Sequence, residues 1–122
     1  MASTLASCGT GLYLYAITLA DASLSLPTEG VEKADVCSVV EGRVAAIVSP
    51  LDAERLHAHR SNLDIHHAIV RALAESRPVL TVPFGATAGS EDELRSALRT
   101  HYNTLAAALD RLRDKVEMHL KV

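Results

Sequence analysis

Histidine is the residue type in this chain that most invites a chemical role. The chain carries six histidines, at positions His57, His59, His66, His67, His101 and His119. A helical zinc pair needs two imidazoles four residues apart, because that spacing places both on one face. His57 and His59 would point about 200° apart on a helix, and the adjacent His66 and His67 diverge. Cys8 and Cys37 form no CxxC motif. We therefore expect no metal site.

His66 differs from the other histidines because it falls in the middle of an apolar helical face, between Leu63 and Val70. One interpretation is a catalytic or ligand-binding imidazole. The other is a neutral imidazole whose buried hydrogen bond orients the helix against a sheet. The second interpretation is favoured, because buried polar groups normally have partners.

Other patterns that carry chemistry are weak or absent. No Gly-x-Ser-x-Gly elbow accompanies the serines, and no glycine-rich loop precedes a lysine as phosphate binding needs. Gly9-Thr10-Gly11 is a lone Gly-x-Gly without a helix opening after it. Tyr13 and Tyr15 form a stripe that is either a ligand platform or, as we expect, core or interface packing. We predict no catalytic residue, no cofactor and no enzymatic activity.

The composition describes one globular domain with an aliphatic core. Hydrophobic residues make up 48% of the 122 residues, yet only Phe84 and three tyrosines are aromatic. The net charge of −3 without a basic cluster argues against a nucleic-acid surface. No stretch is long and apolar enough to span a bilayer, and the first residues lack the positive region of a secretory signal. We expect a cytoplasmic domain that needs no disulfide.

Periodicity and turn signals predict the elements that position these residues. Residues 1–11 are expected to form a flexible tail, and residues 12–122 a single domain. Strands are predicted over residues 12–18, 36–40, 43–48, 79–82 and 116–122, and helices over residues 50–59 and 62–75 and from residue 91 onward. The first strand is apolar on both faces, with Leu12, Leu14 and Ala16 opposite Tyr13, Tyr15 and Ile17, which indicates an interior strand.

Capping and breaking residues mark the predicted boundaries. Three sequences resemble helix-starting capping boxes, namely Ser49-Pro50-Leu51-Asp52, Ser61-Asn62-Leu63-Asp64 and Ser90-Glu91-Asp92-Glu93. Pro78 ends the second helix, and the run that follows, 79–82, reads as a strand covered on both faces until Pro83 and Gly85 stop it. The alternation of residues 116–122 predicts a closing strand with one apolar face.

The order of these elements predicts an α+β fold. Two amphipathic helices over one antiparallel or mixed sheet form a two-layer sandwich, with both helices on one face. A ferredoxin-like variant is the expected architecture.

The chain resembles the amino-terminal domain of the gas vesicle accessory proteins of the F/L type, GvpF/GvpL. The resemblance rests on the order and spacing of four segments: Leu12-Tyr13-Leu14-Tyr15-Ala16-Ile17, the helix from Leu63 through His66 to Val70, Pro78-Val79-Leu80 with Pro83-Phe84-Gly85, and Val116-Glu117-Met118 with Leu120-Lys121-Val122. A proline, Pro83, stands where the family motif has an arginine, so no role of that arginine is carried over. Family members usually continue into a helical second domain.

The resemblance implies a non-enzymatic assembly factor located with gas vesicles in the cytoplasm. Such a protein binds the small amphipathic shell protein and supports shell nucleation or growth, with other gas vesicle accessory proteins as further partners and neither nucleic acid nor membrane. A sheet edge or a groove beside the helices would make the contact, and the sequence does not assign the contact residues. Two alternatives stay open: a ferredoxin-like ligand-binding or enzymatic domain using His66, and a self-associating domain that forms a homo-oligomer.

Overall fold

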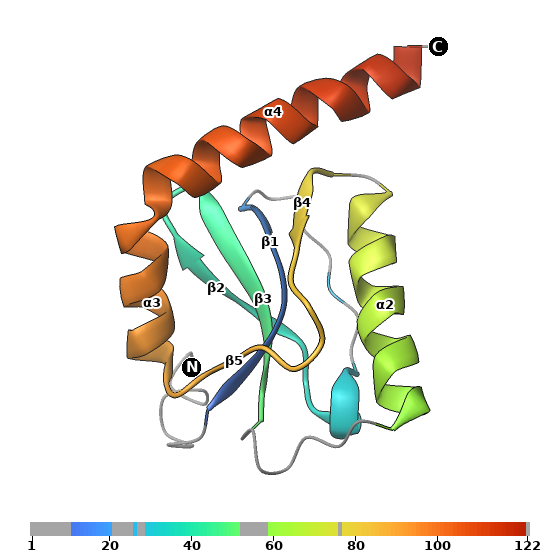
Figure 1. The fold of residues 1–122 in the computed structure, drawn as a ribbon, viewed down its shortest axis with the longest axis vertical. Coiled ribbons are helices and arrows are strands. Elements are labelled where there is room, and N and C mark those ends of the chain that lie inside the picture. Colours follow the sequence, from blue (N-terminus) through green and yellow to red (C-terminus); the bar gives the residue numbers. More distant parts are fainter. Residues whose placement is uncertain (1–10, 21–25, 27–28, 52–58, 76, 122) are drawn as a thin grey trace.

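The computed structural model describes residues 11–20, 26, 29–51, 59–75 and 77–121, the last eight of these by their helical backbone alone (Figure 1). The strands are β1 (Leu12–Leu19), β2 (Cys37–Glu41), β3 (Val44–Pro50), β4 (Val79–Thr81) and β5 (Thr87–Ala88). The helices are a 3-10 turn η1 (Val31–Lys33), α2 (Arg60–Ala74), α3 (Glu91–Thr100) and α4 (Tyr102–Lys121). Residues 1–10 of the expected flexible tail, 1–11, lie outside the described residues, whereas Gly11 is buried and accepts a hydrogen bond from the Leu51 backbone N–H at 3.0 Å. The domain division stays a prediction.

The five strands form one antiparallel sheet in the order β2–β3–β1–β4, and β5 pairs with the opposite end of β1 from β4. The long strands β1 and β3 therefore lie in the interior, as the two apolar faces of the first strand predicted. The strands predicted over residues 36–40 and 43–48 correspond to β2 and β3, which pair as a hairpin. It turns at Gly42, whose φ of +60° suits a tight two-residue turn.

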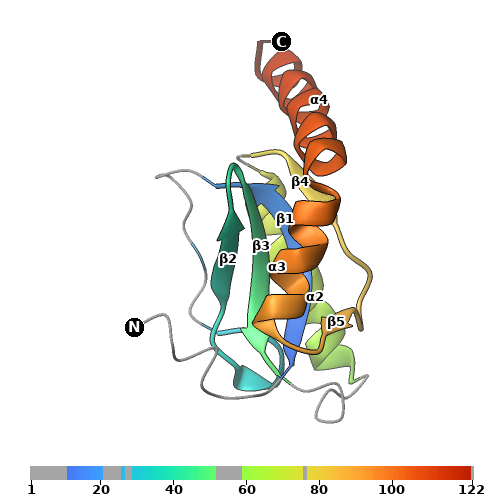
Figure 2. The ribbon, with the colours of Figure 1, turned by 90° about the vertical axis from the view of Figure 1, so that its left-hand side faces the viewer.

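Helices pack against both faces of the sheet (Figures 1 and 2). On one face, Ile69 and Leu73 of α2 join a buried cluster with side chains of β1 and β3. On the other face, Leu98 of α3 and Leu109 of α4 close a second cluster. The α+β class and the antiparallel sheet are confirmed. The structure differs from the expectation of two helices on one face, because an apolar helical stripe does not tell which of two apolar sheet faces it covers.

A β-bulge in β1 redirects the side chains that follow it. The register with β3 shifts between Leu14 and Ala16. Ala16 consequently packs beside Tyr15 in the cluster under α2, while Ile17 packs in the cluster under α3. The predicted strict alternation fails after Tyr15, because a bulge inserts an extra residue and exchanges the two faces.

The beginning of α2 also differs from the prediction. The helix begins at Arg60 with His59 at the N-cap, so Ser61 lies inside the first turn and caps nothing. Pro50 ends β3 instead of opening a helix, and Ser49 is a buried strand residue. The rest of the predicted first helix, 52–58, lies outside the described residues. The capping prediction for Ser49 is wrong because this residue lies in β3, where its hydroxyl lies 2.8 Å from the Tyr15 hydroxyl. The capping prediction for Ser61 is wrong because the helix begins one residue earlier, at Arg60.

Strand β4 lies at the edge of the sheet opposite β2 (Figure 2). Val79 and Leu80 are half-buried and face opposite clusters, whereas Thr81 is exposed. The prediction of a strand covered on both faces is therefore met by Val79 and Leu80 but not by Thr81. The outer edge of this short strand has no strand partner within the described residues. The strand ends before Pro83, and Gly85 takes a φ of +101°, as their residue types predicted.

Helix α3 begins as predicted. The Ser90 hydroxyl accepts a hydrogen bond from the Glu93 backbone N–H at 3.1 Å. The helix breaks at His101, and α4 then continues to Lys121. The predicted closing strand is wrong, because α4 includes Val116 and Leu120, which lie four residues apart and fit a helical repeat as well as an alternating one. Within the described residues, none of the helices combines the length and hydropathy that crossing a bilayer requires.

Candidate functional site

The aromatic residues that the sequence singled out meet in one buried cluster between β1 and α2. Tyr13 and Tyr15 are 0% exposed and His66 is 2% exposed. The two tyrosine rings contact edge to face, with centroids 4.8 Å apart, and the His66 ring lies 5.7 Å from each. Phe84 closes the cluster at 5.9 Å from the rings of Tyr13 and His66.

Both ring nitrogens of His66 are hydrogen-bonded. Nε2 lies 2.9 Å from the carbonyl oxygen of Val82, and because a carbonyl only accepts, Nε2 carries the proton. Nδ1 lies 2.6 Å from the hydroxyl oxygen of Tyr13 and accepts a hydrogen bond from that hydroxyl. The arrangement requires a neutral imidazole, and burial lowers the pKa of His66, which favours the same state. His66 therefore connects α2 to β1 and to the end of β4, as the packing interpretation expected.

The tyrosine hydroxyls are likewise engaged by the fold. The Tyr15 hydroxyl accepts a hydrogen bond from the Val31 backbone N–H at 2.9 Å and lies 2.8 Å from the Ser49 hydroxyl. Burial raises the pKa of Tyr13 to about 12 and also raises that of Tyr15. Both hydroxyls are protonated at neutral pH, so the Tyr13/Tyr15 stripe is core packing and not a ligand platform.

The remaining histidines are not brought together. His59, His67 and His101 are exposed on different parts of the chain, and His57 and the side chain of His119 lie outside the described residues. Among the residues that the structure describes, no group of three His, Cys, Asp or Glu side chains could hold a metal ion. Cys37 is a half-buried free thiol whose pKa is raised by burial, and Cys8 lies outside the described part.

A pocket of about 290 Å³ lies beside the aromatic cluster, between α2 and the segment that follows β4. Its lining residues are His66, His67, Val70, Thr81, Val82, Pro83 and Phe84. The lining contains no carboxylate, lysine or arginine, and His66 presents a neutral ring. The pocket therefore suits an uncharged, mainly apolar group.

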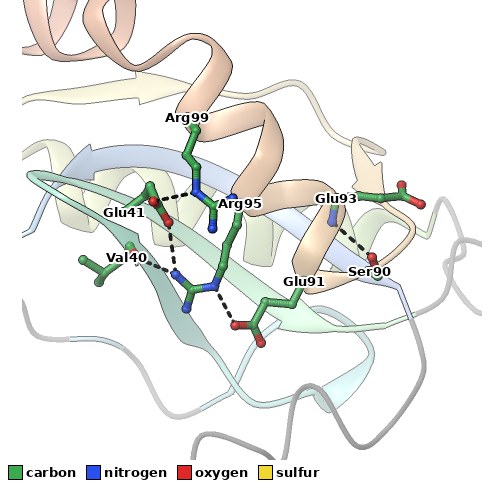
Figure 3. A network of polar contacts seen from close by, with 7 residues as sticks. All are labelled: Val40, Glu41, Ser90, Glu91, Glu93, Arg95 and Arg99. Atoms are coloured by element: carbon green, nitrogen blue, oxygen red, sulfur yellow. Dashed lines mark hydrogen bonds and ion pairs between the residues drawn. The ribbon is translucent and has the colours of Figure 1, made fainter.

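The edge strand β2 is guarded by side chains of α3 (Figure 3). Arg95 donates to the carbonyl oxygen of Val40 at 2.6 Å, and its guanidinium also contacts Glu41 at 3.3 Å and Glu91 at 2.8 Å. Arg99 donates to Glu41 at 2.8 Å, and this hydrogen bond lowers the pKa of the Glu41 carboxyl. The sequence showed the four-residue spacing of Glu91, Arg95 and Arg99 but gave no signal that Val40 and Glu41 lie opposite them.

The hairpin tip is held by α4. The Arg43 backbone N–H donates to the Tyr102 hydroxyl at 2.9 Å, and the Arg43 guanidinium bonds Asp110 at 2.8 Å. A Cβ atom on Gly42 would lie 2.8 Å from the Tyr102 hydroxyl oxygen. The tip therefore fits closely under the first turn of α4, and a side chain at position 42 would need both a positive φ and a displaced Tyr102 ring.

A second polar contact that the sequence did not reveal joins α2 to the segment between β1 and β2. The Asn62 side chain donates to the Glu32 carboxylate at 2.8 Å and accepts from the Glu32 backbone N–H at 3.2 Å. Glu32 and Lys33 both have positive φ angles, +52° and +62°. Asn62 is 5% exposed, so this contact fixes an unusual backbone course against the first turns of α2.

A family model described as "Gas vesicle synthesis protein GvpL/GvpF" matches residues 11–122. The chain belongs to the GvpL/GvpF family. The match extends from the first described residue through α4, and so includes the aromatic cluster, both sheet edges and the hairpin tip. It confirms the resemblance seen in the sequence and supports a role in gas vesicles.

Crystal structures of two GvpF proteins share the fold. The gas vesicle protein GvpF from Anabaena sp. PCC7120 aligns with a TM-score of 0.68 at 21% identity. The GvpF from Microcystis aeruginosa aligns with a TM-score of 0.68 at 19% identity. Each alignment covers 84% of this chain and 43% of the GvpF chain, so this chain spans less than half the length of those proteins. No curated protein gives a significant match.

Proposed function

We propose that this domain is a non-enzymatic assembly factor of gas vesicles, which binds the small amphipathic shell protein in the cytoplasm and supports nucleation or growth of the shell. The observation that carries the proposal is the family match over residues 11–122. The structure adds that no buried side-chain nitrogen or oxygen among the described residues lacks a hydrogen-bond partner. The polar interior therefore serves the fold, and a partner meets the domain at its surface.

The physical basis of the proposal is the exposure of apolar surface by a shell subunit before it polymerises. Such a subunit aggregates unless another protein covers that surface. A domain with an open strand edge offers backbone hydrogen bonds, and an adjacent pocket offers apolar contact. Temporary cover of this kind keeps the subunit available for addition to a growing shell.

Co-expression of the chain with the shell protein tests the proposal. The fraction of shell protein that stays soluble, and the amount that co-purifies on a tag attached to this chain, are measured against the tag alone. We expect both quantities to rise with the chain present. An unchanged soluble fraction, together with no co-purification across a range of salt concentrations, contradicts the proposal.

The two alternative functions, a chemical role for His66 and self-association, require different structural features. An enzymatic or ligand-binding role for His66 needs an accessible ring nitrogen, but His66 is 2% exposed and both nitrogens are hydrogen-bonded. Self-association is compatible with an assembly role, because a sheet edge can pair with a second copy. Sedimentation velocity at increasing concentration detects such pairing as a rising sedimentation coefficient.

A further inference from the structure

We propose that the outer edge of β4 and the pocket beside it form the binding site for an extended, uncharged apolar segment of the partner protein. The inference rests on the proposed function, which names the shell subunit as that partner, and adds the place and the mode of contact. The segment would add to the sheet next to β4 and insert one apolar side chain between α2 and the Val82–Phe84 segment.

The two edges of the sheet differ in the charged side chains that lie along them. At the β2 edge, Arg95 donates a hydrogen bond to the carbonyl oxygen of Val40 at 2.6 Å. Further charges surround this bond, from Glu41, Glu91 and Arg99. Inward-facing charges of this kind protect an edge from pairing with another chain. At the β4 edge, none of Val79, Leu80 and Thr81 is charged, and Thr81 is exposed. Strand addition is therefore open at β4 and blocked at β2.

The segment that follows β4 lies beside the pocket. β4 pairs with residues 16–18 of β1 and β5 pairs with residues 12–13, so the segment between them leaves the sheet. The His66 ring holds that segment by its hydrogen bond to the Val82 carbonyl, and the pocket lies between it and α2. An added strand directs alternate side chains to one face, so one side chain in two can reach a pocket on the α2 side.

The residues that line the pocket determine which kind of side chain can bind there. Its lining offers four apolar side chains, from Val70, Val82, Pro83 and Phe84, and no Asp, Glu, Lys or Arg. A charged side chain entering it would lose hydration without gaining a counter-charge, whereas an apolar side chain would release ordered water. The complementary ligand is therefore an uncharged apolar side chain on an extended backbone.

A capped hexapeptide of alternating threonine and valine with one central leucine is a suitable probe. Backbone amide NMR shifts of the full chain are followed during titration to millimolar peptide. We expect shifts at Leu80, Thr81 and Val70 and none at Val40. Two matched peptides separate the contributions: glutamate in place of leucine tests the pocket, and N-methylation of alternate amides tests the strand pairing. Each change should weaken binding at least about tenfold.

Two substitutions in the chain locate the site. Thr81→Lys places a charge on the β4 edge and should weaken peptide binding at least about tenfold, since edge lysines oppose strand addition. Thr104→Lys, at an exposed position on α4, makes the same chemical change away from the edge and should leave binding as in the unmodified chain. Shifts centred on Val40, equal binding of the N-methylated peptide, or no shifts at all would each overturn the inference.

The same variants separate this inference from the proposed function. If the shell protein is retained equally by the unmodified chain and by Thr81→Lys, the β4 site is wrong and the function stands. If the hexapeptide binds at β4 but the shell protein is not retained, the site stands and the function is wrong.

Discussion

His66 shows why residue type alone did not define a chemical role. An imidazole that donates to Val82 and accepts from Tyr13 has no free nitrogen for a substrate or metal. The sequence indicated this outcome by placing His66 among apolar residues, but it could not name the two partners, which lie 16 and 53 positions away. Tyr13 lies on β1 and Val82 directly follows β4, so the histidine fixes the orientation of α2 against the sheet.

The stability of the chain should fall as the pH drops below about 6.5. Burial lowers the pKa of His66 in the folded state, so the unfolded chain binds a proton that the folded chain excludes. The contribution of the neutral His66 to stability is therefore fully present above the unfolded pKa and is lost as the pH falls toward the folded pKa. The free energy of unfolding falls by at most about 1.4 kcal/mol per pH unit. Urea unfolding between about pH 7.5 and 5 measures the slope.

His66→Gln should reduce that slope, because glutamine does not titrate and its amide can both donate and accept. His67→Gln, at an exposed neighbouring position, is the matched control and should keep the slope of the unmodified chain. A slope that survives in His66→Gln and disappears in His67→Gln would contradict the assignment.

Tyr15→Phe should destabilise the fold by about 1–3 kcal/mol, because it leaves the Val31 N–H and the Ser49 hydroxyl buried without this partner. Tyr102→Phe is the control. Its hydroxyl accepts from the exposed Arg43 backbone N–H, which water can satisfy after the change, so a smaller loss is expected. Thermal unfolding of both variants gives the comparison, and equal losses would argue against a special role for the buried hydroxyl.

At the scale of elements, polar contacts join α3 and α4 to the ends and edges of the sheet, in addition to the apolar packing on its faces. α3 guards β2 through Arg95 and Arg99, and α4 holds the hairpin tip through Tyr102. Local sequence predicted where α3 begins, since Ser90 and Glu93 are a cap within one turn. It could not predict these ties, because each joins residues more than fifty positions apart in the chain.

Gly42→Ala should destabilise the hairpin tip for two separable reasons. An alanine at φ +60° costs about 1–2 kcal/mol, and its Cβ would also meet the Tyr102 hydroxyl at 2.8 Å. In a Tyr102→Leu background the hydroxyl is absent, so only the backbone cost should remain. A double-mutant cycle by urea unfolding should give a coupling of about 1 kcal/mol, and additive losses would exclude the steric contact.

Arg95→Met should open the β2 edge while changing stability little, because partly exposed ion pairs contribute at most about 1 kcal/mol. The freed Val40 carbonyl and the exposed Val40 side chain, 41% accessible, then form an unprotected edge. Sedimentation velocity should show concentration-dependent association. Arg60→Met, at an exposed position paired with Asp64 at 3.9 Å, should show the same sedimentation behaviour as the unmodified chain. Association of both variants would point to lost charge instead of edge exposure.

At the scale of the whole molecule, the sequence predicted what depends on local pattern and missed what depends on neighbours. The two apolar faces of residues 12–18 predicted the interior strand, and the helices were predicted to be amphipathic. The bulge at Tyr15 and the use of both sheet faces were not predicted, because each is decided by packing across the sheet. The helix continuing to Lys121 was missed because its sequence also fits an alternating pattern. The same limit applies to the site, since an open edge and a pocket exist only once strands have found their order.

The most direct test is the amount of shell protein retained by three chains at equal folded concentration: the unmodified chain, Tyr15→Phe and Thr81→Lys. Tyr15 belongs to the interior and lines no part of the pocket, whereas Thr81 lies at the open edge. If the domain acts by its surface, Tyr15→Phe retains as much shell protein as the unmodified chain, and Thr81→Lys retains less by about tenfold. Loss of retention in Tyr15→Phe with full retention in Thr81→Lys would contradict the account.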